Sequence, residues 1–255
     1  MGANVLDELK MDGSKIALVT GAAGTMGRAA ARALLTEASR LVLVDIDEKA
    51  LLEFARELPA QTYPIAFDIS DYAQVKASMA RVQSEFGDVD ILVNNAGVLS
   101  KHKALDTTPE EWHRVLRVNL DGAFFLSQMV LPAMKRKRWG RIINVSSFAA
   151  KSGGITAGTA YTVSKGGLIS LTFALAAETA ADGVTVNGIA PAYVKTPMVT
   201  AQLTAEERQM VIEKIPVRRY CEPEEFAHVV TFLASPLAGF MTGEIIDLNG
   251  GLQFD

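Results

Sequence analysis

The sequence predicts an α/β fold in which a doubly wound parallel sheet of seven strands carries helices on both faces. Two observations support this prediction. Short β-rich runs alternate with amphipathic stretches along all 255 residues, and several runs are almost entirely apolar, as in strands buried on both faces. Because no linker, internal repeat or low-complexity tract interrupts the alternation, we expect a single domain spanning residues 1–255.

The expected elements alternate in order along the chain. The apolar runs predict strands over 15–20, 40–45, 62–66, 89–94, 141–146, 184–190 and 244–248. The amphipathic stretches predict helices over 25–38, 47–58, 70–86, 109–138, 158–181 and 222–235. Thr108-Pro109-Glu110-Glu111 is typical of a helix start, with a capping hydroxyl, a proline and two acids. Asp182-Gly183 provides the stop for the helix over 158–181.

Composition narrows the classes of function. The formal net charge of −4 argues against a nucleic-acid partner, and the basic run 135–138 is interpreted as the cationic end of a long helix. The chain has one cysteine, Cys221, no visible signal peptide and no apolar run long enough to span a bilayer, so we expect a cytoplasmic protein without membrane association. The histidines are scattered, and we expect no catalytic metal.

A glycine-rich turn joins the first expected strand to the helix that follows it. The strand ends at Thr20 and continues directly into Gly21-Ala22-Ala23-Gly24-Thr25-Met26-Gly27. Glycines in such a turn let backbone N–H groups approach a pyrophosphate, and the helix N-terminus adds partial positive charge. The turn therefore predicts a dinucleotide site formed by Gly21, Gly24, Thr25, Met26 and Gly27.

The ends of the next strands complete this predicted site. Asp45 ends the second strand, at about the spacing where an acid meets the adenosine ribose. A carboxylate there would repel a 2′-phosphate by up to about 4 kcal/mol at ~4 Å and an effective dielectric of about 20, so Asp45 predicts NAD rather than NADP. Asp68 is placed to touch the adenine, and Asn94-Asn95-Ala96-Gly97 is interpreted as part of the cofactor wall.

Tyr161 and Lys165 are the candidate catalytic pair. They lie four residues apart in the helix expected over 158–181, so their side chains share one helix face. A nearby cation favours the phenolate and lowers the pKa of a tyrosine from its usual value of about 10. The pair therefore predicts proton transfer to and from a hydroxyl or carbonyl group.

Together these motifs resemble those of the short-chain dehydrogenase/reductase family. The resemblance covers essentially the whole chain and includes Thr20-Gly21, Asn94-Asn95-Ala96-Gly97, Asn119, Ser147, Tyr161, Lys165 and Pro191. It implies a single-domain Rossmann fold and hydride transfer between a nicotinamide and a secondary alcohol or ketone.

The resemblance also implies roles for individual residues. Tyr161 would be the acid/base, and Lys165 would lower its pKa and hold the nicotinamide ribose. Ser147 would orient the substrate oxygen; it is preferred to Ser146 by strand alternation after Asn144 and by its distance from Tyr161. Asn119 would support a water-linked proton relay. The resemblance adds Asp68, Ile69, Asn95, Ala96, Gly97, Tyr161, Lys165, Pro191, Val194 and Thr196 to the cofactor site.

Three departures from the family pattern bear on function. Thr25 stands where most single-domain members have a glycine, and the spacing Gly21-x-x-Gly24-x-x-Gly27 is that of extended members such as epimerases and dehydratases. The sequence after Pro191 is too short for their substrate domain. Ala192 replaces the glycine that usually follows this proline. Position 24 lacks the basic residue with which many members hold NADPH, which favours NAD.

The substrate class stays open among several alternatives. Residues 193–216 are expected to form an apolar lid, although the pattern at Leu203–Ile215 also fits an ordinary short helix. The leading hypothesis is an NAD-linked oxidation of a sugar, polyol or other small hydroxy compound. The alternatives are a 3-oxoacyl-carrier-protein reductase, an epimerase-like enzyme and a non-catalytic NAD sensor. Apolar residues on several faces of the helices over 109–138 and 158–181 predict burial by a partner subunit, and the resemblance implies the family's usual homotetramer, with 241–255 joining an interface.

Overall fold

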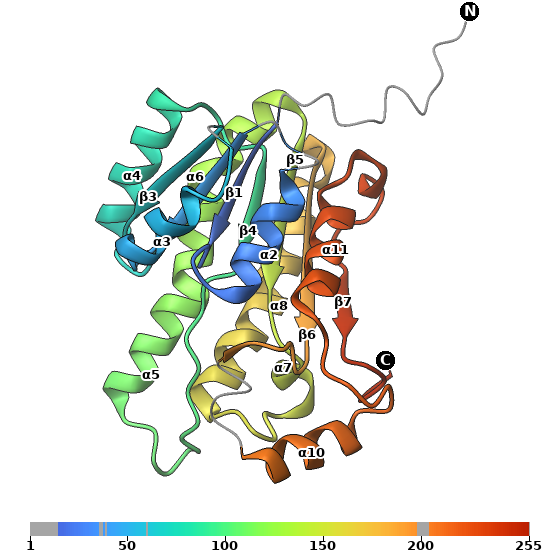
Figure 1. Ribbon diagram of the computed structural model, residues 1–255. Helices are drawn as coiled ribbons and strands as arrows, with labels where there is room; N and C mark the ends of the chain where they lie inside the picture. The colour runs from blue at the N-terminus through green and yellow to red at the C-terminus, as the bar shows by residue number, and fades with distance from the viewer. Residues whose placement is uncertain (1–14, 36–37, 39, 60, 198–203, 255) are drawn as a thin grey trace, which may run out of the picture.

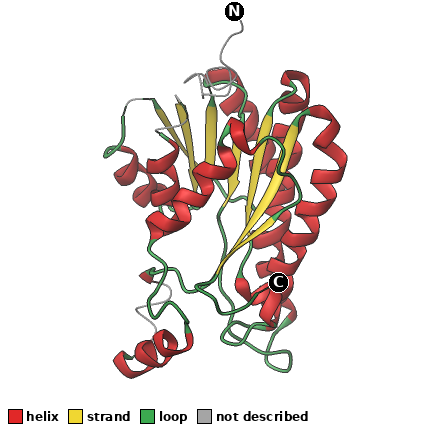
Figure 2. Ribbon diagram, turned by 90° about the vertical axis from the view of Figure 1, so that its right-hand side faces the viewer, coloured by secondary structure: helices red, strands yellow, loops and turns green. Residues whose placement is uncertain are grey.

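The computed structural model describes residues 15–35, 38, 40–59, 61–197 and 204–254. Its centre is a parallel sheet of seven strands in the order β3-β2-β1-β4-β5-β6-β7, with helices on both faces (Figures 1 and 2). The predicted α/β fold is confirmed. The strands are β1 (Ile16–Thr20), β2 (Arg40–Asp45), β3 (Thr62–Ala66), β4 (Ile91–Asn94), β5 (Gly140–Val145), β6 (Val184–Pro191) and β7 (Ile245–Leu248).

Side-chain alternation along the strands divides the core into two layers. In β1, Leu18 packs into one apolar cluster, whereas Ala17 and Val19 pack into the other. The same alternation separates Val42 from Leu43 in β2. Because successive side chains of a strand point to opposite faces, a run that is apolar throughout requires helices on both sides of the sheet.

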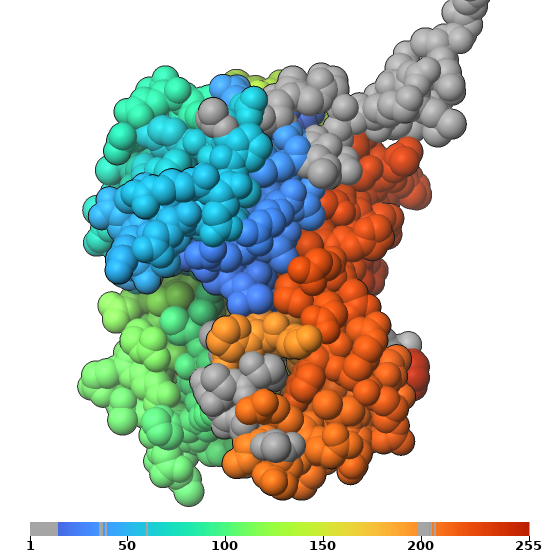
Figure 3. Space-filling view, in the orientation of Figure 1, coloured from blue at the N-terminus to red at the C-terminus, as the bar shows by residue number. Residues whose placement is uncertain are grey.

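The helices supply those two layers. One layer consists of α2 (Thr25–Leu34), α3 (Glu48–Ala55) and α11 (Pro223–Ala234). The other contains α4 (Tyr72–Glu85), α6 (Gly122–Lys137) and α8 (Thr159–Thr179). On the surface of the first layer, α2 (blue) and α11 (red-orange) lie side by side (Figure 3).

The helix predicted over 109–138 is interrupted. Its first part, α5 (Pro109–Leu116), begins as predicted, because the Thr108 hydroxyl accepts a hydrogen bond of 3.2 Å from the Glu111 N–H. A π-helical turn, η1 (Arg117–Asp121), then separates α5 from α6. Such a turn contains an extra residue and redirects the side chains within it. Hydrophobic periodicity does not register one inserted residue, so the sequence predicted a continuous helix.

Two short helices border the site. Helix α7 (Phe148–Ser152) follows β5, and α10 (Ala205–Lys214) lies within the segment expected to form a lid. The sequence analysis did not separate α7, because five residues are too few to show helical periodicity. Met198 and Leu203 of the expected lid lie outside the described residues.

The strand order positions the site. From β1 the chain continues to β2 and β3 on one side of the sheet, and then crosses to β4 on the other side of β1. The turns that follow β1 and β4 therefore diverge at the carboxyl edge of the sheet. In α/β sheets ligands bind at such a switch point.

Candidate active site

The glycine turn is fixed by close contacts with its neighbours. Gly21 has φ +62°, and a Cβ built there would lie 2.9 Å from the Ala96 Cα. A Cβ on Gly27 would lie 2.0 Å from the Gly21 carbonyl oxygen, so both positions require glycine. The Thr20 hydroxyl accepts hydrogen bonds of 3.0 Å from the Asn95 and Ala96 N–H groups, which joins the turn to the segment after β4.

The turn borders a cavity of about 550 Å³. Helix α2 begins at Gly24 without a side-chain cap, so its first N–H groups face the cavity unpaired by any side chain. A Cβ on Gly24 would make only an ordinary contact with the protein, 3.4 Å from the Gly21 oxygen. The open space at Gly24 fits a phosphate group approaching the backbone.

Asp45 lines this cavity next to the glycine turn. One carboxylate oxygen accepts a hydrogen bond of 2.9 Å from the Ala23 N–H, and the other accepts one of 3.1 Å from the Asp47 N–H. Asp45, Asp47 and Asp68 line the cavity, and its lining within the described part of the chain contains no lysine or arginine. This part of the cavity is therefore electronegative.

The residues predicted to bind the cofactor fall into two groups. Those that line the dinucleotide cavity are Gly21, Gly24, Thr25, Met26, Gly27, Asp45, Asp68, Ile69, Asn95, Ala96, Gly97 and Thr196. Tyr161, Lys165, Pro191 and Val194 line a second cavity of about 510 Å³. The two cavities share Met26, Asn95, Gly97, Val98 and Thr196 in their linings, so they are parts of one continuous cleft.

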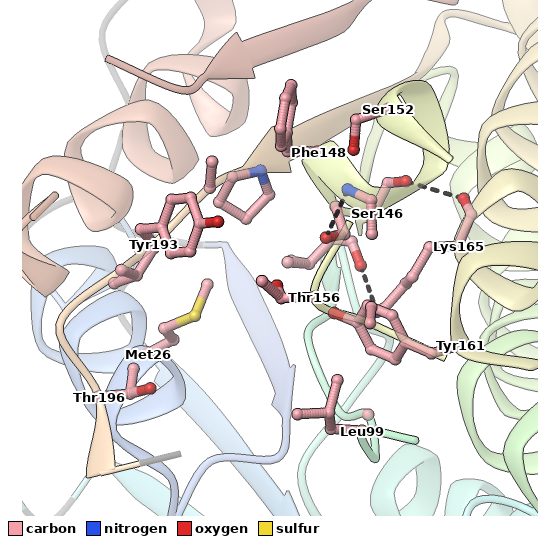
Figure 4. A pocket seen from close by; sticks show the side chains of 18 of the residues that line it. Met26, Leu99, Ser146, Phe148, Ser152, Thr156, Tyr161, Lys165, Tyr193 and Thr196 are labelled. Carbon is pink, nitrogen blue, oxygen red and sulfur yellow. Dashed lines mark hydrogen bonds between the residues drawn. The ribbon is translucent and has the colours of Figure 1, made fainter. Parts of the chain in front are cut away.

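Tyr161 and Lys165 lie on one side of the second cavity, and Met26, Tyr193 and Thr196 lie on the other (Figure 4). The Lys165 Nζ lies 5.8 Å from the centre of the Tyr161 ring. It also donates a hydrogen bond of 2.7 Å to the carbonyl of Val145 at the end of β5. This bond holds the lysine between its helix and the sheet.

Desolvation controls the protonation of this pair. It raises the pKa of the Tyr161 phenol above its usual value, and a hydrogen bond with the Ser147 hydroxyl opposes that shift. Burial lowers the pKa of Lys165 to about 8. The sequence predicted that Lys165 would lower the pKa of Tyr161; in the protein alone the net shift of the Tyr161 pKa is upward, and the effect of Lys165 stays a prediction. Removal from water penalises the charged forms of both groups.

The two serines after β5 have different partners. Ser146 is buried, and its hydroxyl donates to the Lys165 backbone carbonyl at 2.8 Å. Ser147 caps α7, where its hydroxyl accepts a hydrogen bond of 3.1 Å from the Ala149 N–H, and it faces Tyr161. The hydroxyl available beside Tyr161 is thus that of Ser147.

Asn119 lies in the π-helical turn η1 and is buried. Its amide joins three elements: it donates 3.0 Å bonds to the Val98 carbonyl and the Ser164 hydroxyl, and it accepts a 2.8 Å bond from the Val98 N–H. A Cβ on Gly97 would lie 3.3 Å from both the Asn119 Oδ1 and the Lys165 Nζ, which places these two polar groups on the same side of this glycine.

The sequence analysis missed most of the wall facing Tyr161. Phe148, Ser152, Thr156 and Lys101 line the second cavity, together with Leu99 near Tyr161 (Figure 4). These residues belong to loops or to the short helix α7, where no periodic pattern marks the inward side. Val211 of α10 also lines the cavity, so part of the segment predicted as a lid does border it.

The fold and the cleft are those of an oxidoreductase, with a dinucleotide cavity and a buried tyrosine beside it. The chain belongs to the short-chain dehydrogenase/reductase family. Residues 21–253 match a family model described as enoyl-(acyl carrier protein) reductase. Members of the family use a nicotinamide cofactor and act on CH–OH or keto groups.

Curated relatives and a solved structure cover nearly the whole chain. Nodulation protein G from Azospirillum brasilense is 40% identical over 94% of this chain and 98% of its own length. A 3-oxoacyl-[acyl-carrier-protein] reductase from Thermotoga maritima is 36% identical over 96% of this chain and 99% of its own. A crystal structure from Agrobacterium tumefaciens, described provisionally as a gluconate dehydrogenase, aligns with a TM-score of 0.88 at 31% identity, over 96% of this chain and 97% of that one.

The described residues contain neither a candidate membrane-spanning helix nor a candidate metal site. None of the helices there is long and apolar enough to cross a membrane. In the same ranges, no group of three or more His, Cys, Asp and Glu side chains is arranged to hold a metal ion.

Proposed function

We propose that the protein is an NAD-dependent dehydrogenase that interconverts a secondary alcohol and its ketone in a small hydroxy compound. The observation that carries this proposal is the position of Tyr161, whose phenol meets the Ser147 hydroxyl in a cavity continuous with the dinucleotide site. An acid/base beside a nicotinamide site is what alcohol oxidation needs. The nicotinamide, when bound, accepts the hydride from the carbinol carbon.

The protein residues manage the proton. Ser147 donates a hydrogen bond to the substrate oxygen and so orients it, and Tyr161 takes the hydroxyl proton during oxidation and returns it during reduction. Lys165 stabilises the phenolate that forms. Its ammonium is desolvated, so its attraction to a new negative charge is stronger than in water. Asn119 and Lys165 meet at Gly97, and we propose that this is where the proton passes between Tyr161 and bulk water.

Support for NAD rather than NADP comes from Asp45. Its carboxylate can accept hydrogen bonds from the ribose hydroxyls, whereas a 2′-phosphate would meet the charges of Asp45 and Asp47. Within the described part of this cavity lining, no lysine or arginine offsets them.

The first experiment is NADH formation from NAD with a panel of sugars, polyols, hydroxy acids and secondary alcohols. Tyr161→Phe is run in parallel, with NAD binding measured by calorimetry. We expect turnover that falls at least about 10²-fold in the variant, because a positioned acid/base contributes about that much or more, while NAD binds normally. Full activity in Tyr161→Phe would refute the mechanism. Tightly held NAD without NADH release would indicate an epimerase-like enzyme, and binding without any turnover would indicate an NAD sensor.

A second candidate function is reduction of a 3-oxoacyl group on a carrier protein. The 36% identity to a reductase of that name in Thermotoga maritima favours it. Faster oxidation of NADPH than of NADH with a 3-oxoacyl thioester would distinguish this reductase function from the NAD-dependent dehydrogenase function.

We also propose that the single domain assembles as a cytoplasmic homotetramer. Phe124 on α6 and Phe173 on α8 are 41% and 50% exposed, and large apolar side chains exposed on adjacent helices favour burial by another subunit. Phe240 and Phe254, near the C-terminal end of the described chain, are almost fully exposed and are candidates for a second interface. Light scattering after gel filtration tests the subunit number.

A further inference from the structure

The two parts of the cleft have opposite charge. The dinucleotide cavity is lined by Asp45, Asp47 and Asp68. The second cavity has Lys101 and Lys165 as its charged lining residues, and none of its lining residues in the described chain is acidic. Residues 198–203, which lie outside the described part, contain no charged side chain in the sequence. The substrate end of the cleft is therefore electropositive.

Lys101 is the lysine that catalysis does not use. Lys165 is buried and donates to Val145, so its position is fixed by the reaction site. Lys101 is exposed, and it forms no hydrogen bond or ion pair with any described residue. The nearby carboxylate of Glu111 is already paired, at 2.7 Å, with the His102 ring. The positive charge of Lys101 is thus left for a group that enters the cavity.

The backbone on both sides of Lys101 is held in place. The carbonyl of Ser100 accepts a 2.7 Å hydrogen bond from the Gly158 N–H, and that of His102 accepts a 3.0 Å bond from the Thr159 N–H. A Cβ on Gly158 would lie 2.5 Å from the His102 oxygen, so the approach of the two segments is as close as glycine allows. Lys101 therefore has a fixed backbone at the rim of the cavity and a side chain that can move to meet a ligand.

We propose that Lys101 determines substrate specificity by binding an anionic group of the substrate, at a distance from the carbon that reacts at Tyr161. This inference rests on the dehydrogenase function proposed above and narrows its substrate class. The lining of the same cavity also includes Leu99, Ile155 and Phe148, which are apolar. The substrate class that fits is a hydroxy or keto compound with a negative charge at one end, either a carboxylate or the phosphate of a thioester carrier.

The test compares anionic substrates with uncharged counterparts that carry the same acyl chain. The first arm uses 3-hydroxy acids of increasing chain length and their methyl esters, with NAD. The second arm uses 3-oxoacyl-coenzyme A and the uncharged N-acetylcysteamine thioester of the same acyl group, with NADH. The enzyme, Lys101→Met and Lys76→Met are assayed; Lys76 is an exposed lysine of α4 that does not line the cavity, so its variant controls for net charge.

We expect the anionic member of one pair to be favoured in kcat/KM, and Lys101→Met to reduce that preference about tenfold, as for loss of a hydrogen bond to a charged group. Lys76→Met should retain the preference. Loss in the acid arm identifies a carboxylate, and loss in the thioester arm identifies a carrier phosphate. Turnover of neutral and anionic members alike, unchanged in Lys101→Met, would overturn the role of Lys101 and leave the dehydrogenase intact. Absence of turnover in every pair, from an enzyme that oxidises another compound of the earlier panel, would overturn the anionic substrate class and leave the dehydrogenase intact.

Discussion

The Lys165 ammonium donates a 2.7 Å hydrogen bond to the carbonyl of Val145, twenty residues earlier in the chain. The bond ties α8 to the end of β5, and it is a buried contact of a group whose pKa burial lowers to about 8. The lysine that we propose to stabilise the Tyr161 phenolate is thus also a structural link. Its protonation should be visible in the stability of the fold.

Lys165→Met should change how stability depends on pH. A folded-state pKa of about 8, below the unfolded value, means that the unfolded chain binds more protons between about pH 8 and 10. Stability conferred by this group therefore rises with pH across that window. We expect the free energy of unfolding of the wild type, relative to Lys165→Met, to increase by roughly 2 kcal/mol from pH 8 to pH 10, at about 1.36 kcal/mol per unit. Urea denaturation of both proteins measures it, and parallel pH profiles would contradict it.

Asp45→Asn should shift cofactor preference toward NADP. The amide oxygen can still accept the hydrogen bond from the Ala23 N–H, so the turn should keep its shape while the negative charge is lost. We expect the ratio of kcat/KM for NADP to that for NAD to rise about tenfold or more, because one charge repulsion is removed.

Asp47→Asn is the matched control for Asp45. Asp47 lines the same cavity, but its side chain caps α3 by accepting a 3.0 Å bond from the Ala50 N–H. We expect a smaller change in the cofactor ratio in this variant. An equal ratio for Asp45→Asn and the wild type would show that Asp45 does not select the cofactor.

Asn119→Leu should lower the free energy of unfolding as well as the rate of turnover. Leucine can neither donate a hydrogen bond to the Val98 carbonyl nor accept one from the Val98 N–H. It also cannot donate to the Ser164 hydroxyl. Unpartnered buried polar groups each cost about 1–3 kcal/mol, so we expect a loss of about 2–4 kcal/mol in urea denaturation. Asn119→Asp retains the acceptor for Val98 and should lose less. A variant as stable as the wild type would mean that the π-helical turn does not depend on this amide.

Lys103→Met should weaken substrate binding without affecting NAD. The Lys103 ammonium donates 2.7 Å hydrogen bonds to the carbonyls of Gly154 and Ala157, on either side of Ile155 and Thr156 in the cavity wall. Losing these charge-assisted bonds should loosen that wall, and we expect kcat/KM to fall roughly tenfold. The NAD dissociation constant should stay the same. Lys103→Arg, which keeps the charge and the donors, should recover most of the activity. Unchanged kcat/KM in Lys103→Met would show that the loop does not depend on this contact.

Local patterns were enough to predict the sheet and the cofactor turn. The apolar runs define strands whose bounds agree with the structure to within two residues, because burial on both faces leaves its mark in every residue of a strand. The interruption at η1 and the helix α7 were not predicted, since one extra residue and a five-residue helix produce no periodic signal. Of the predicted lid, Val211 borders the cavity, and Met198 and Leu203 lie outside the described residues.

The sequence by itself determined the α/β fold, the glycine turn after β1, the acid at Asp45, and the spacing that puts Tyr161 and Lys165 on one helix face. Each depends on residues near one another in the chain. Only the tertiary structure decided that burial raises the pKa of Tyr161, that Asn119 bridges Val98 and Ser164, and that Lys101 borders the substrate cavity. Those properties depend on desolvation and on contacts between segments far apart in sequence, which exist only once the sheet has brought the loops together at its carboxyl edge.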